Sequence, residues 1–286
     1  MERAARVSFR GYGGTRLVGE AWGDAGAQPV LLLPGGGQTR HAWGDTAQRL
    51  ASEGWYAISL DLRGHGESDW AADGNYSLSA FVADLLAVLE HLEQPPVLVG
   101  ASLGGITGLL VAGEEKPDAF AALVLVDIAP RMEAAGVQRI VEFMRAHLDG
   151  FASLEEAARA VAAYLTHRPP PKDLRGLRKN LRRGPDGRYR WHWDPRFVLG
   201  ERRPDASQQP ERLLAAARNL RIPTLLVRGR MSDVISEASV REFLEHVPHA
   251  RYVDVAQAGH MIAGDQNDLF TTAVVDFLRS LRLAEP

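Results

Sequence analysis

The chain contains no cysteine among its 286 residues. This absence excludes disulfide bonds, thiolate-ligated metal centres, iron–sulfur clusters and a cysteine nucleophile. No apolar stretch approaches the ~18 uninterrupted residues that a membrane-spanning helix needs. The N-terminal segment Met1–Arg6 is not followed by the apolar run of a signal peptide. We therefore expect a cytoplasmic globular protein with no membrane partner.

The chain also lacks a strong excess of charge of either sign. The formal net charge is −3, with 45% apolar and 24% charged residues, as in ordinary soluble proteins. A basic stretch, 172–190, is followed by aromatic residues, and such aromatics can stack on nucleic-acid bases. Because sequence-independent binding needs a dominant basic field, we instead interpret this stretch as a solvated helix face and expect no nucleic-acid partner.

Short apolar runs alternate with helical patterns over two parts of the chain. The runs are almost entirely apolar, as strands covered on both faces should be. They are Val30–Leu33, Trp55–Leu60, Val97–Ala101, Leu123–Val126, Thr224–Val227 and a weaker sixth run, Arg251–Val255. The helical segments between them are 42–52, 78–92, 103–113, 237–246 and 268–282. This alternation predicts an α/β fold with a parallel sheet and helices on both faces, preceded by an antiparallel hairpin made from 7–10 and 16–22.

The alternation is interrupted between residues 131 and 217. This segment has helical patterns at 133–147 and 154–167 and almost no strand signal. It is too long for a structureless loop, because such loops rarely exceed ~15 residues. We therefore predict a core domain formed by residues 1–130 and 218–286, with residues 131–217 inserted as a helical cap.

The segment Gly100-Ala101-Ser102-Leu103-Gly104 has the Gly-x-Ser-x-Gly pattern of a nucleophile elbow. In such a turn the serine sits between a strand and a helix with its hydroxyl exposed. The glycines two positions before and after it remove side chains that would collide across the turn. The pattern follows an apolar strand and opens an apolar helix, as this mechanism requires, so Ser102 is the candidate nucleophile.

A serine hydroxyl needs a base, and the base needs an acid that fixes its tautomer. His260 is the best-placed base of nine histidines, because it follows the last strand run. Two aspartates follow strand runs and are candidates for the acid: Asp233, after the run ending at Val227, and Asp127, directly after Val126. The order serine, aspartate, histidine together with the location after the penultimate strand run favours Asp233, and Asp127 stays open as the alternative.

Acyl transfer also needs hydrogen-bond donors for the oxyanion of the tetrahedral intermediate. We expect them to be the backbone N–H groups of Leu103, at the start of a helix, and Gly36, in the Gly35-Gly36-Gly37 run after a buried strand. No Gly-Lys-Ser/Thr sequence follows these glycines, and no Gly-x-Gly-x-x-Gly fingerprint is present. We therefore predict neither a nucleotide nor any other cofactor or metal.

The sequence resembles the α/β-hydrolase superfamily over nearly its whole length. The resemblance is carried by motifs in the family's order and spacing, namely Pro34-Gly35-Gly36-Gly37, Asp61-Leu62-Arg63-Gly64-His65-Gly66-Glu67-Ser68, Gly100–Gly104, Gly229–Asp233 and Gly259-His260. It implies a mostly parallel eight-stranded sheet, with Ser102 as nucleophile, His260 as base and Asp233 as acid. It also implies that the loop holding Asp61 and His65 is structural rather than catalytic.

Two features depart from the common family pattern. Pro34 stands where many members carry a histidine, which is usually structural. The second is Asp127, because some members, including lactonases that open zearalenone-type macrocycles, have their acid after that earlier strand. The resemblance therefore leaves the identity of the acid open.

We expect a serine hydrolase that cleaves a small-molecule carboxylic ester or lactone through an acyl-enzyme on Ser102. Trp191, Trp193 and Phe197 of the cap are candidate substrate-binding residues. The alternatives on the same fold and triad are a carbon–carbon bond hydrolase, a perhydrolase, a cofactor-free lyase and a non-enzymatic ligand receptor. Serine at position 102 argues against epoxide hydrolases and haloalkane dehalogenases, whose relatives use aspartate there.

Overall fold

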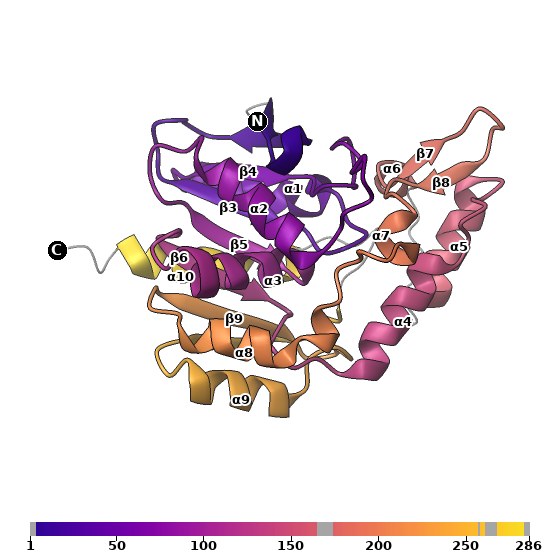
Figure 1. The fold of residues 1–286 in the computed structure, drawn as a ribbon. Helices are drawn as coiled ribbons and strands as arrows, with labels where there is room; N and C mark the ends of the chain where they lie inside the picture. Colours follow the sequence, from indigo (N-terminus) through magenta and orange to yellow (C-terminus); the bar gives the residue numbers. More distant parts are fainter. Residues whose placement is uncertain (1–3, 165–173, 257, 261–267, 283–286) are drawn as a thin grey trace.

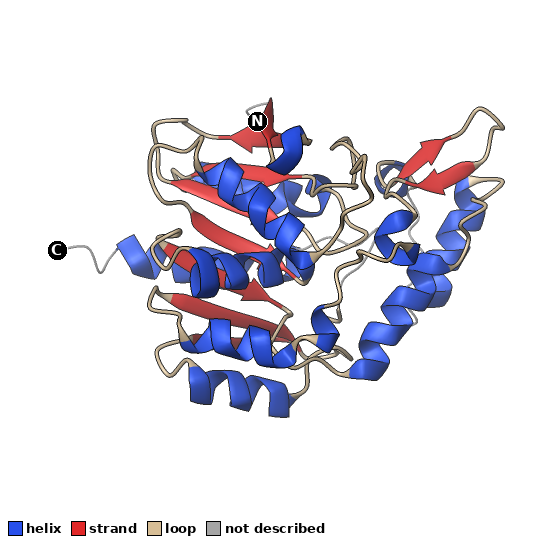
Figure 2. Ribbon diagram, in the orientation of Figure 1, coloured by secondary structure: helices blue, strands red, loops and turns tan. Residues whose placement is uncertain are grey.

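A computed structural model describes residues 4–164, 174–256, 258–260 and 268–282. Its central feature is a twisted sheet with helices on both faces, and a smaller group of helices and strands stands beyond one end of that sheet (Figure 1). Colouring by secondary structure separates the sheet from its helical layers (Figure 2). This arrangement is the α/β fold that the alternating pattern predicts.

The sheet has eight strands in the order β1-β2-β4-β3-β5-β6-β9-β10. Their bounds are β1 Ala5–Arg10, β2 Arg16–Trp22, β3 Pro29–Leu33, β4 Tyr56–Leu60, β5 Val97–Ala101, β6 Ala122–Val126, β9 Thr224–Gly229 and β10 Arg251–Val255. The first two strands form an antiparallel hairpin, β2 also pairs antiparallel with β4, and the remaining neighbours are parallel. The mostly parallel eight-stranded sheet and the N-terminal hairpin are therefore confirmed.

Two helical layers cover the sheet. One apolar core lies under α1 (Gly44–Ser52) and α10 (Asp268–Arg282). The other core lies under α2 (Leu78–Leu89), α3 (Leu103–Leu110), α8 (Pro210–Arg218) and α9 (Glu237–His246). Every residue of β3, β5 and β6 is buried, because helices pack on both of their faces. Short 3₁₀ or π segments occur at Tyr12–Gly14, Arg40–Trp43, Val111–Glu115 and Ala206–Gln208.

The insertion after β6 forms most of the smaller group of elements. It contains α4 (Ala134–Arg145), α5 (Leu154–Tyr164), α6 (Arg175–Arg178), β7 (Leu181–Arg183), β8 (Tyr189–Trp191) and α7 (Arg196–Leu199). Helix α8 instead packs against α3 and α9 in the core layer (Figure 1). We propose that these elements form the cap and that it ends before α8, rather than at residue 217.

The cap is not purely helical, so our expectation of almost no strand in this segment is wrong. Strands β7 and β8 pair antiparallel around the turn 184–188, where Gly187 has φ 79°. The Pro185-Asp186-Gly187 sequence is a strong turn signal, but the flanking strands are too short to show a clear alternation. The basic stretch is likewise not one helix face, because most of its arginines lie on this hairpin or in its turn.

Candidate active site

The sheet topology brings the candidate site residues to one edge. Strands β3, β5, β6 and β9 are parallel neighbours, and in each the chain leaves the sheet at the same edge. The glycine loop follows β3, Ser102 follows β5, and Asp127 follows β6. Ligand sites in open parallel sheets lie at this carboxyl edge. Residues far apart in the sequence can therefore form one site.

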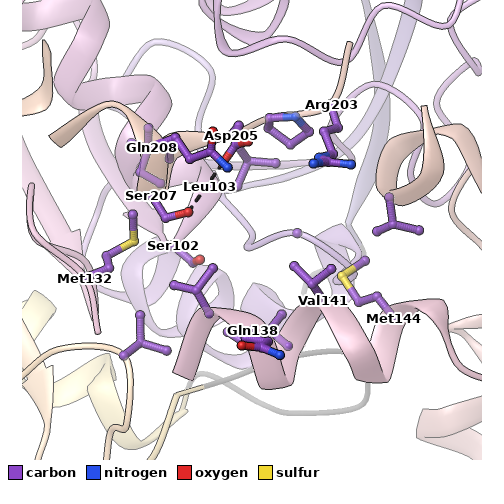
Figure 3. Close-up of a pocket in the computed structure, with 18 of the residues that line it drawn as sticks. Ser102, Leu103, Met132, Gln138, Val141, Met144, Arg203, Asp205, Ser207 and Gln208 are labelled. Atoms are coloured by element: carbon purple, nitrogen blue, oxygen red, sulfur yellow. Dashed lines mark hydrogen bonds between the residues drawn. The ribbon is translucent and has the colours of Figure 1, made fainter. Parts of the chain in front are cut away.

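Ser102 occupies a strained turn between β5 and α3. Its backbone angles are φ 44° and ψ −114°, and a positive φ is uncommon for a residue with a side chain. Such strain costs on the order of 1–3 kcal/mol and persists only where the surrounding structure enforces it. Ser102 lies on the wall of a cavity, where its side chain is seen in Figure 3. These features match the predicted nucleophile elbow.

The glycines that flank Ser102 have no room for a side chain. A Cβ on Gly100 would lie 2.5 Å from the backbone carbonyl carbon of Gly104. A Cβ on Gly104 would lie 2.6 Å from both Cβ and the backbone oxygen of Leu33. Both distances are well inside van der Waals contact. Close packing of α3 on β3 and β5 therefore explains the glycines of the motif.

His260 is paired with Asp127. The distance from His260 Nδ1 to Asp127 Oδ2 is 2.7 Å, and both side chains are buried. Asp127 Oδ2 also accepts a hydrogen bond from the Ser232 hydroxyl at 2.8 Å, and its Oδ1 accepts one from the Gly229 N–H at 3.1 Å. These two donors orient the carboxylate, so Nδ1 of His260 donates to it and Nε2 is left as the acceptor.

Asp233, our preferred acid, lies elsewhere. Its carboxylate is ion-paired with Arg139 of α4 at 2.8 Å, and the two side chains are 35% and 56% exposed. After β9 the chain turns, and Ser232 rather than Asp233 reaches Asp127. The backbone oxygen of Asp233 packs against Gly136, where an added Cβ would lie 2.1 Å away. The preference for Asp233 therefore disagrees with this geometry, whereas the alternative, Asp127, agrees with it.

The location of Asp233 after the penultimate strand misled the sequence argument about the acid. Asp233 stands four residues beyond the end of β9, so the direction of its side chain depends on the turn. Asp127 directly follows β6, the strand that pairs with β5 next to Ser102. The absence of any intervening residues between strand and carboxylate was the available signal for Asp127.

The glycine loop after β3 presents Gly36 to the same cavity. The N–H of Gly35 donates to Gln38 Oε1 at 2.9 Å, and the N–H of Gly37 donates to His65 Nε2 at 3.0 Å. The neighbouring donors on both sides are thus used within the protein. Gly36 and Leu103 both line the cavity, and Leu103 begins α3, where the first N–H groups have no intrahelical partner. This arrangement agrees with the predicted pair of oxyanion donors.

His65 is structural, as the resemblance implies, and it works together with His192, which the sequence analysis missed. His65 Nδ1 donates to the backbone oxygen of Arg63 at 2.9 Å. Burial lowers the pKa of His65 to about 4 and also lowers the pKa of His192 well below its usual value. Both rings are therefore neutral near pH 7. Nothing in the local sequence of His192 indicates this position.

A cavity of about 480 Å³ adjoins Ser102 and His260. Much of its wall is apolar and comes from α4 and α7, including Val137, Ile140, Val141, Met144 and Phe197. Figure 3 shows Val141 and Met144 on one side of this space and Arg203 and Asp205 on the other. The size is typical of a site for a small molecule.

Of the three aromatic cap residues predicted to bind substrate, only Phe197 lines this cavity. Trp191 and Trp193 stack on each other with ring centroids 4.9 Å apart, and both are buried. They pack the interior of the cap, which is the more common role of such side chains. The sequence of this aromatic segment could not show which of its side chains line the cavity and which fill the interior of the cap.

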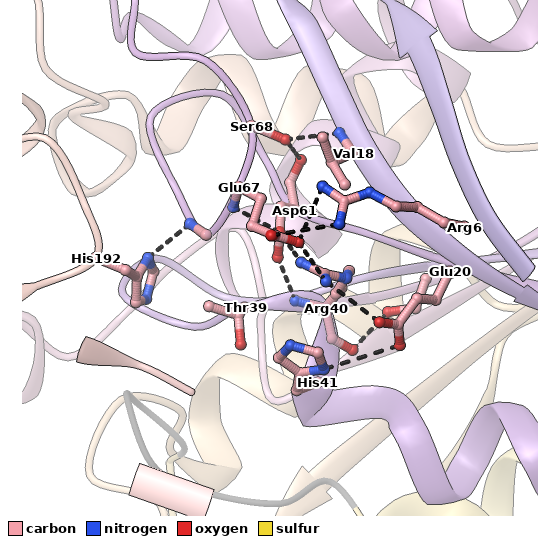
Figure 4. Close-up of polar contacts among 12 residues, drawn as sticks. Arg6, Val18, Glu20, Thr39, Arg40, His41, Asp61, Glu67, Ser68 and His192 are labelled. Atoms are coloured by element: carbon pink, nitrogen blue, oxygen red, sulfur yellow. Dashed lines mark hydrogen bonds and ion pairs between the residues drawn. The ribbon is translucent and has the colours of Figure 1, made fainter. Parts of the chain in front are cut away.

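An ion-pair network centred on the buried Arg40 and Asp61 holds the loop that follows β4 (Figure 4). Arg40 contacts Asp61 at 2.5 Å, Glu67 at 2.6 Å and Glu20 at 3.2 Å. Asp61 is fully buried and also accepts the N–H groups of Arg40 and Glu67. The network thus joins three segments of the core, and Asp61 has a structural role.

Within the described ranges, no three histidine, aspartate or glutamate side chains gather in a way that could hold a metal ion. None of the described helices is both long and apolar enough to cross a membrane.

The comparisons with known proteins identify the family. The sequence pattern of the α/β hydrolase fold family matches residues 28–266. An esterase of Mycobacterium tuberculosis is 32% identical over 86% of this chain and 80% of its own length. A 3-hydroxybutyrate-oligomer hydrolase of Cupriavidus necator is 28% identical over 86% and 87% of the two chains.

Solved structures agree with this result. The crystal structure of an α/β hydrolase from Novosphingobium aromaticivorans is 29% identical and superimposes with a TM-score of 0.78, over 98% of this chain and 99% of that one. The chain therefore belongs to the α/β-hydrolase fold family and is a hydrolase.

Proposed function

We propose that the protein hydrolyses small-molecule carboxylic esters or lactones through an acyl-enzyme on Ser102. The observation that carries the proposal is the shared cavity. Ser102, in its strained elbow, and His260 both line this cavity, and Nδ1 of His260 is 2.7 Å from the buried carboxylate of Asp127. An esterase and a lipase among the relatives support ester hydrolysis as the reaction class.

In the first half-reaction, Ser102 Oγ attacks the carbonyl carbon of the substrate while His260 Nε2 accepts the hydroxyl proton. The carbonyl oxygen gains negative charge, which the N–H groups of Gly36 and Leu103 stabilise. When the carbon–oxygen bond of the leaving alcohol breaks, His260 returns its proton to that oxygen. In the second half-reaction, water repeats these steps on the acyl-enzyme, and the acid and free Ser102 are released.

Asp127 acts as the acid of the triad in this proposal. Its carboxylate holds the proton of the imidazole on Nδ1 and stabilises the imidazolium that forms after Ser102 loses its proton. The apolar wall supplied by α4 and Phe197 favours a substrate whose acyl or alcohol part is apolar. A ligand receptor with a retained triad is the rival function, and carbon–carbon bond hydrolysis is the rival reaction.

Labelling with a fluorophosphonate tests the nucleophile. We expect the wild-type protein to be labelled once and to hydrolyse p-nitrophenyl esters, whereas Ser102→Ala is unlabelled and at least about 10⁴-fold slower. Ser52→Ala is the matched control, because this exposed serine at the end of α1 bonds only within its own helix. It should label like the wild type.

Substrate panels then separate the rival reactions. Esters, lactones and vinylogous diketones are compared at equal enzyme concentration, and an acyl-enzyme is sought by intact mass after rapid quenching. A folded wild-type protein that is neither labelled nor active on esters and lactones would refute the proposed function. Turnover confined to the diketones would assign the carbon–carbon reaction instead.

A further inference from the structure

Two buried histidines form hydrogen bonds with Gly37, in the glycine loop after β3 that we call the oxyanion loop. His65 belongs to the core and His192 to the proposed cap. His65, in the core, accepts a hydrogen bond from the N–H of Gly37 at 3.0 Å. His192, which directly follows β8 of the cap, contacts the backbone oxygen of the same residue through Nε2 at 3.1 Å. Gly37 has φ 81°, a left-handed conformation in which other residues are strained. The glycine next to the proposed oxyanion donor is therefore fixed from both of its peptide groups.

The backbone partners settle the tautomers of both rings. Nδ1 of His192 accepts from the N–H of Gly66 at 2.7 Å, so its proton is on Nε2, which donates to Gly37. Nε2 of His65 accepts from Gly37, so its proton is on Nδ1, which donates to the backbone oxygen of Arg63. Each neutral ring thus uses its one donor and its one acceptor.

The cap contacts the oxyanion loop at several further points. A Cβ on Gly37 would lie 3.0 Å from Met144 and 3.5 Å from Trp193, and a Cβ on Gly36 would lie 3.1 Å from Phe197. Beside this loop, the N–H of Asp194 donates to the backbone oxygen of Gly64 at 2.9 Å. Residues 191–197 of the cap therefore pack closely against the oxyanion loop and the neighbouring loop of the core.

His192 connects the two core loops that flank it. Figure 4 shows the ring of His192 hydrogen-bonded to the loop that carries Glu67. The same loop is also held by Asp61, which accepts the N–H of Glu67 and is paired with Arg40. Arg182 of β7 adds a hydrogen bond to the backbone oxygen of Gly66. The ring of His192 thus bridges the loop that carries Gly66 to Gly37.

We propose that His192 is a positioning residue through which the cap sets the direction of the Gly36 N–H. The oxyanion hole is then complete only while residues 191–197 are seated on the core. The proposal rests on the proposed function, because it assigns Gly36 as an oxyanion donor. Without the bond from His192, the Gly37–Gln38 peptide is held, among the described residues, only by the hydrogen bond from the Gln38 N–H to the backbone oxygen of Gly35 at 3.1 Å. A shift of this turn then moves the adjoining Gly36 N–H away from the position that the oxyanion will occupy.

A matched pair of substitutions separates the two hydrogen bonds of His192. In His192→Gln the side-chain amide can still donate to Gly37 but no longer accepts from Gly66. In His192→Asn the shorter side chain can still accept from Gly66 but no longer reaches Gly37. Each variant loses one hydrogen bond and neither changes the charge, so similar melting temperatures are expected.

The kinetic signatures should differ. We expect His192→Asn to lower kcat about 10- to 100-fold with KM within about twofold, because a misplaced donor weakens transition-state stabilisation alone. Its affinity for a trifluoromethyl ketone, which forms a tetrahedral adduct with the serine, should fall in parallel. His192→Gln should keep kcat within about threefold of the wild type.

Equal kcat and equal ketone affinity in both variants and the wild type would overturn the proposal, as would equal losses in both variants. Should His192→Asn fail to fold, His65→Asn and His65→Gln repeat the comparison from the core side, since only the longer amide reaches Gly37. Wild-type kcat in His65→Asn would then overturn it. An inactive and unlabelled wild-type protein would refute the proposed function itself, and the assignment of Gly36 with it.

Discussion

Replacing Asp127 with asparagine tests the assignment of the triad acid. The carboxylate accepts from the Gly229 N–H on Oδ1 and from His260 and Ser232 on Oδ2. An asparagine keeps its oxygen at Gly229, because the opposite orientation would bring two donors together. Its NH₂ group then faces Nδ1 of His260. The imidazole must accept there, so its proton moves to Nε2, and Nε2 can no longer take the proton of Ser102.

The cost follows from this change of tautomer. In serine proteases the same substitution lowers kcat about 10⁴-fold without changing the geometry. We expect a loss of about 10³- to 10⁴-fold here, which corresponds to about 4–5.5 kcal/mol of transition-state stabilisation. KM should change little, because Asp127 is behind His260 and does not line the cavity. The near-equal size of the two side chains should leave the fold intact.

Asp233→Asn is the matched control, because it makes the same chemical change at the rival position. Asp233 is ion-paired with Arg139 near the surface, and such exposed pairs contribute at most about 1 kcal/mol. We expect kcat within about twofold of the wild type. Steady-state hydrolysis of p-nitrophenyl esters, with circular dichroism as a check of folding, measures both variants. If Asp233→Asn abolishes turnover while Asp127→Asn retains it, the reasoning from the 2.7 Å contact is refuted.

Two further predictions concern stability. Burial lowers the pKa of His65 from 6.5 to about 4, with Asp194 and Arg182 as the charged groups that act on it and His192 packed beside it. Below pH 6.5 the unfolded chain takes up a proton that the folded protein refuses until about pH 4. The lowered pKa of His65 should therefore reduce the free energy of unfolding, measured with urea, by about 2 kcal/mol between pH 7 and pH 5. If His65→Gln shows the same reduction, His65 is not its cause. Gly104→Ala should lower the free energy of unfolding by about 3 kcal/mol, because its Cβ would lie 2.6 Å from Leu33. Gly44→Ala is the control, because a Cβ on Gly44 meets nothing within 4 Å. Equal melting temperatures for the two variants would count against the close packing of the elbow.

Much of the fold could be predicted because its signals are local. The fully apolar runs at 30–33 and 97–101 are strands that helices cover on both faces, and both are buried throughout. The glycines around Ser102 reflect contacts within one strand–turn–helix unit, so the sequence pattern already carries their reason. The position of Ser102 therefore followed from the order of the residues.

The pairing of Asp127 with His260 could not be derived from that order. Both aspartates follow strands, and the direction of each side chain depends on turns and on neighbouring strands that the chain order does not specify. The buried position of Trp193 could not be derived either, because an aromatic residue in this segment fits a cavity wall and the interior of the cap equally well.

The amino-acid order was sufficient for the strands of the main sheet, the elbow and the family, because periodicity and glycine spacing record contacts between residues close in the chain. The three-dimensional arrangement was needed for the acid, for the cavity wall and for the two histidines that hold Gly37. His192 and Gly37 are separated by 155 residues and meet through a single hydrogen bond. Such a contact leaves no periodic trace in the sequence, because it depends on how the cap packs against the core.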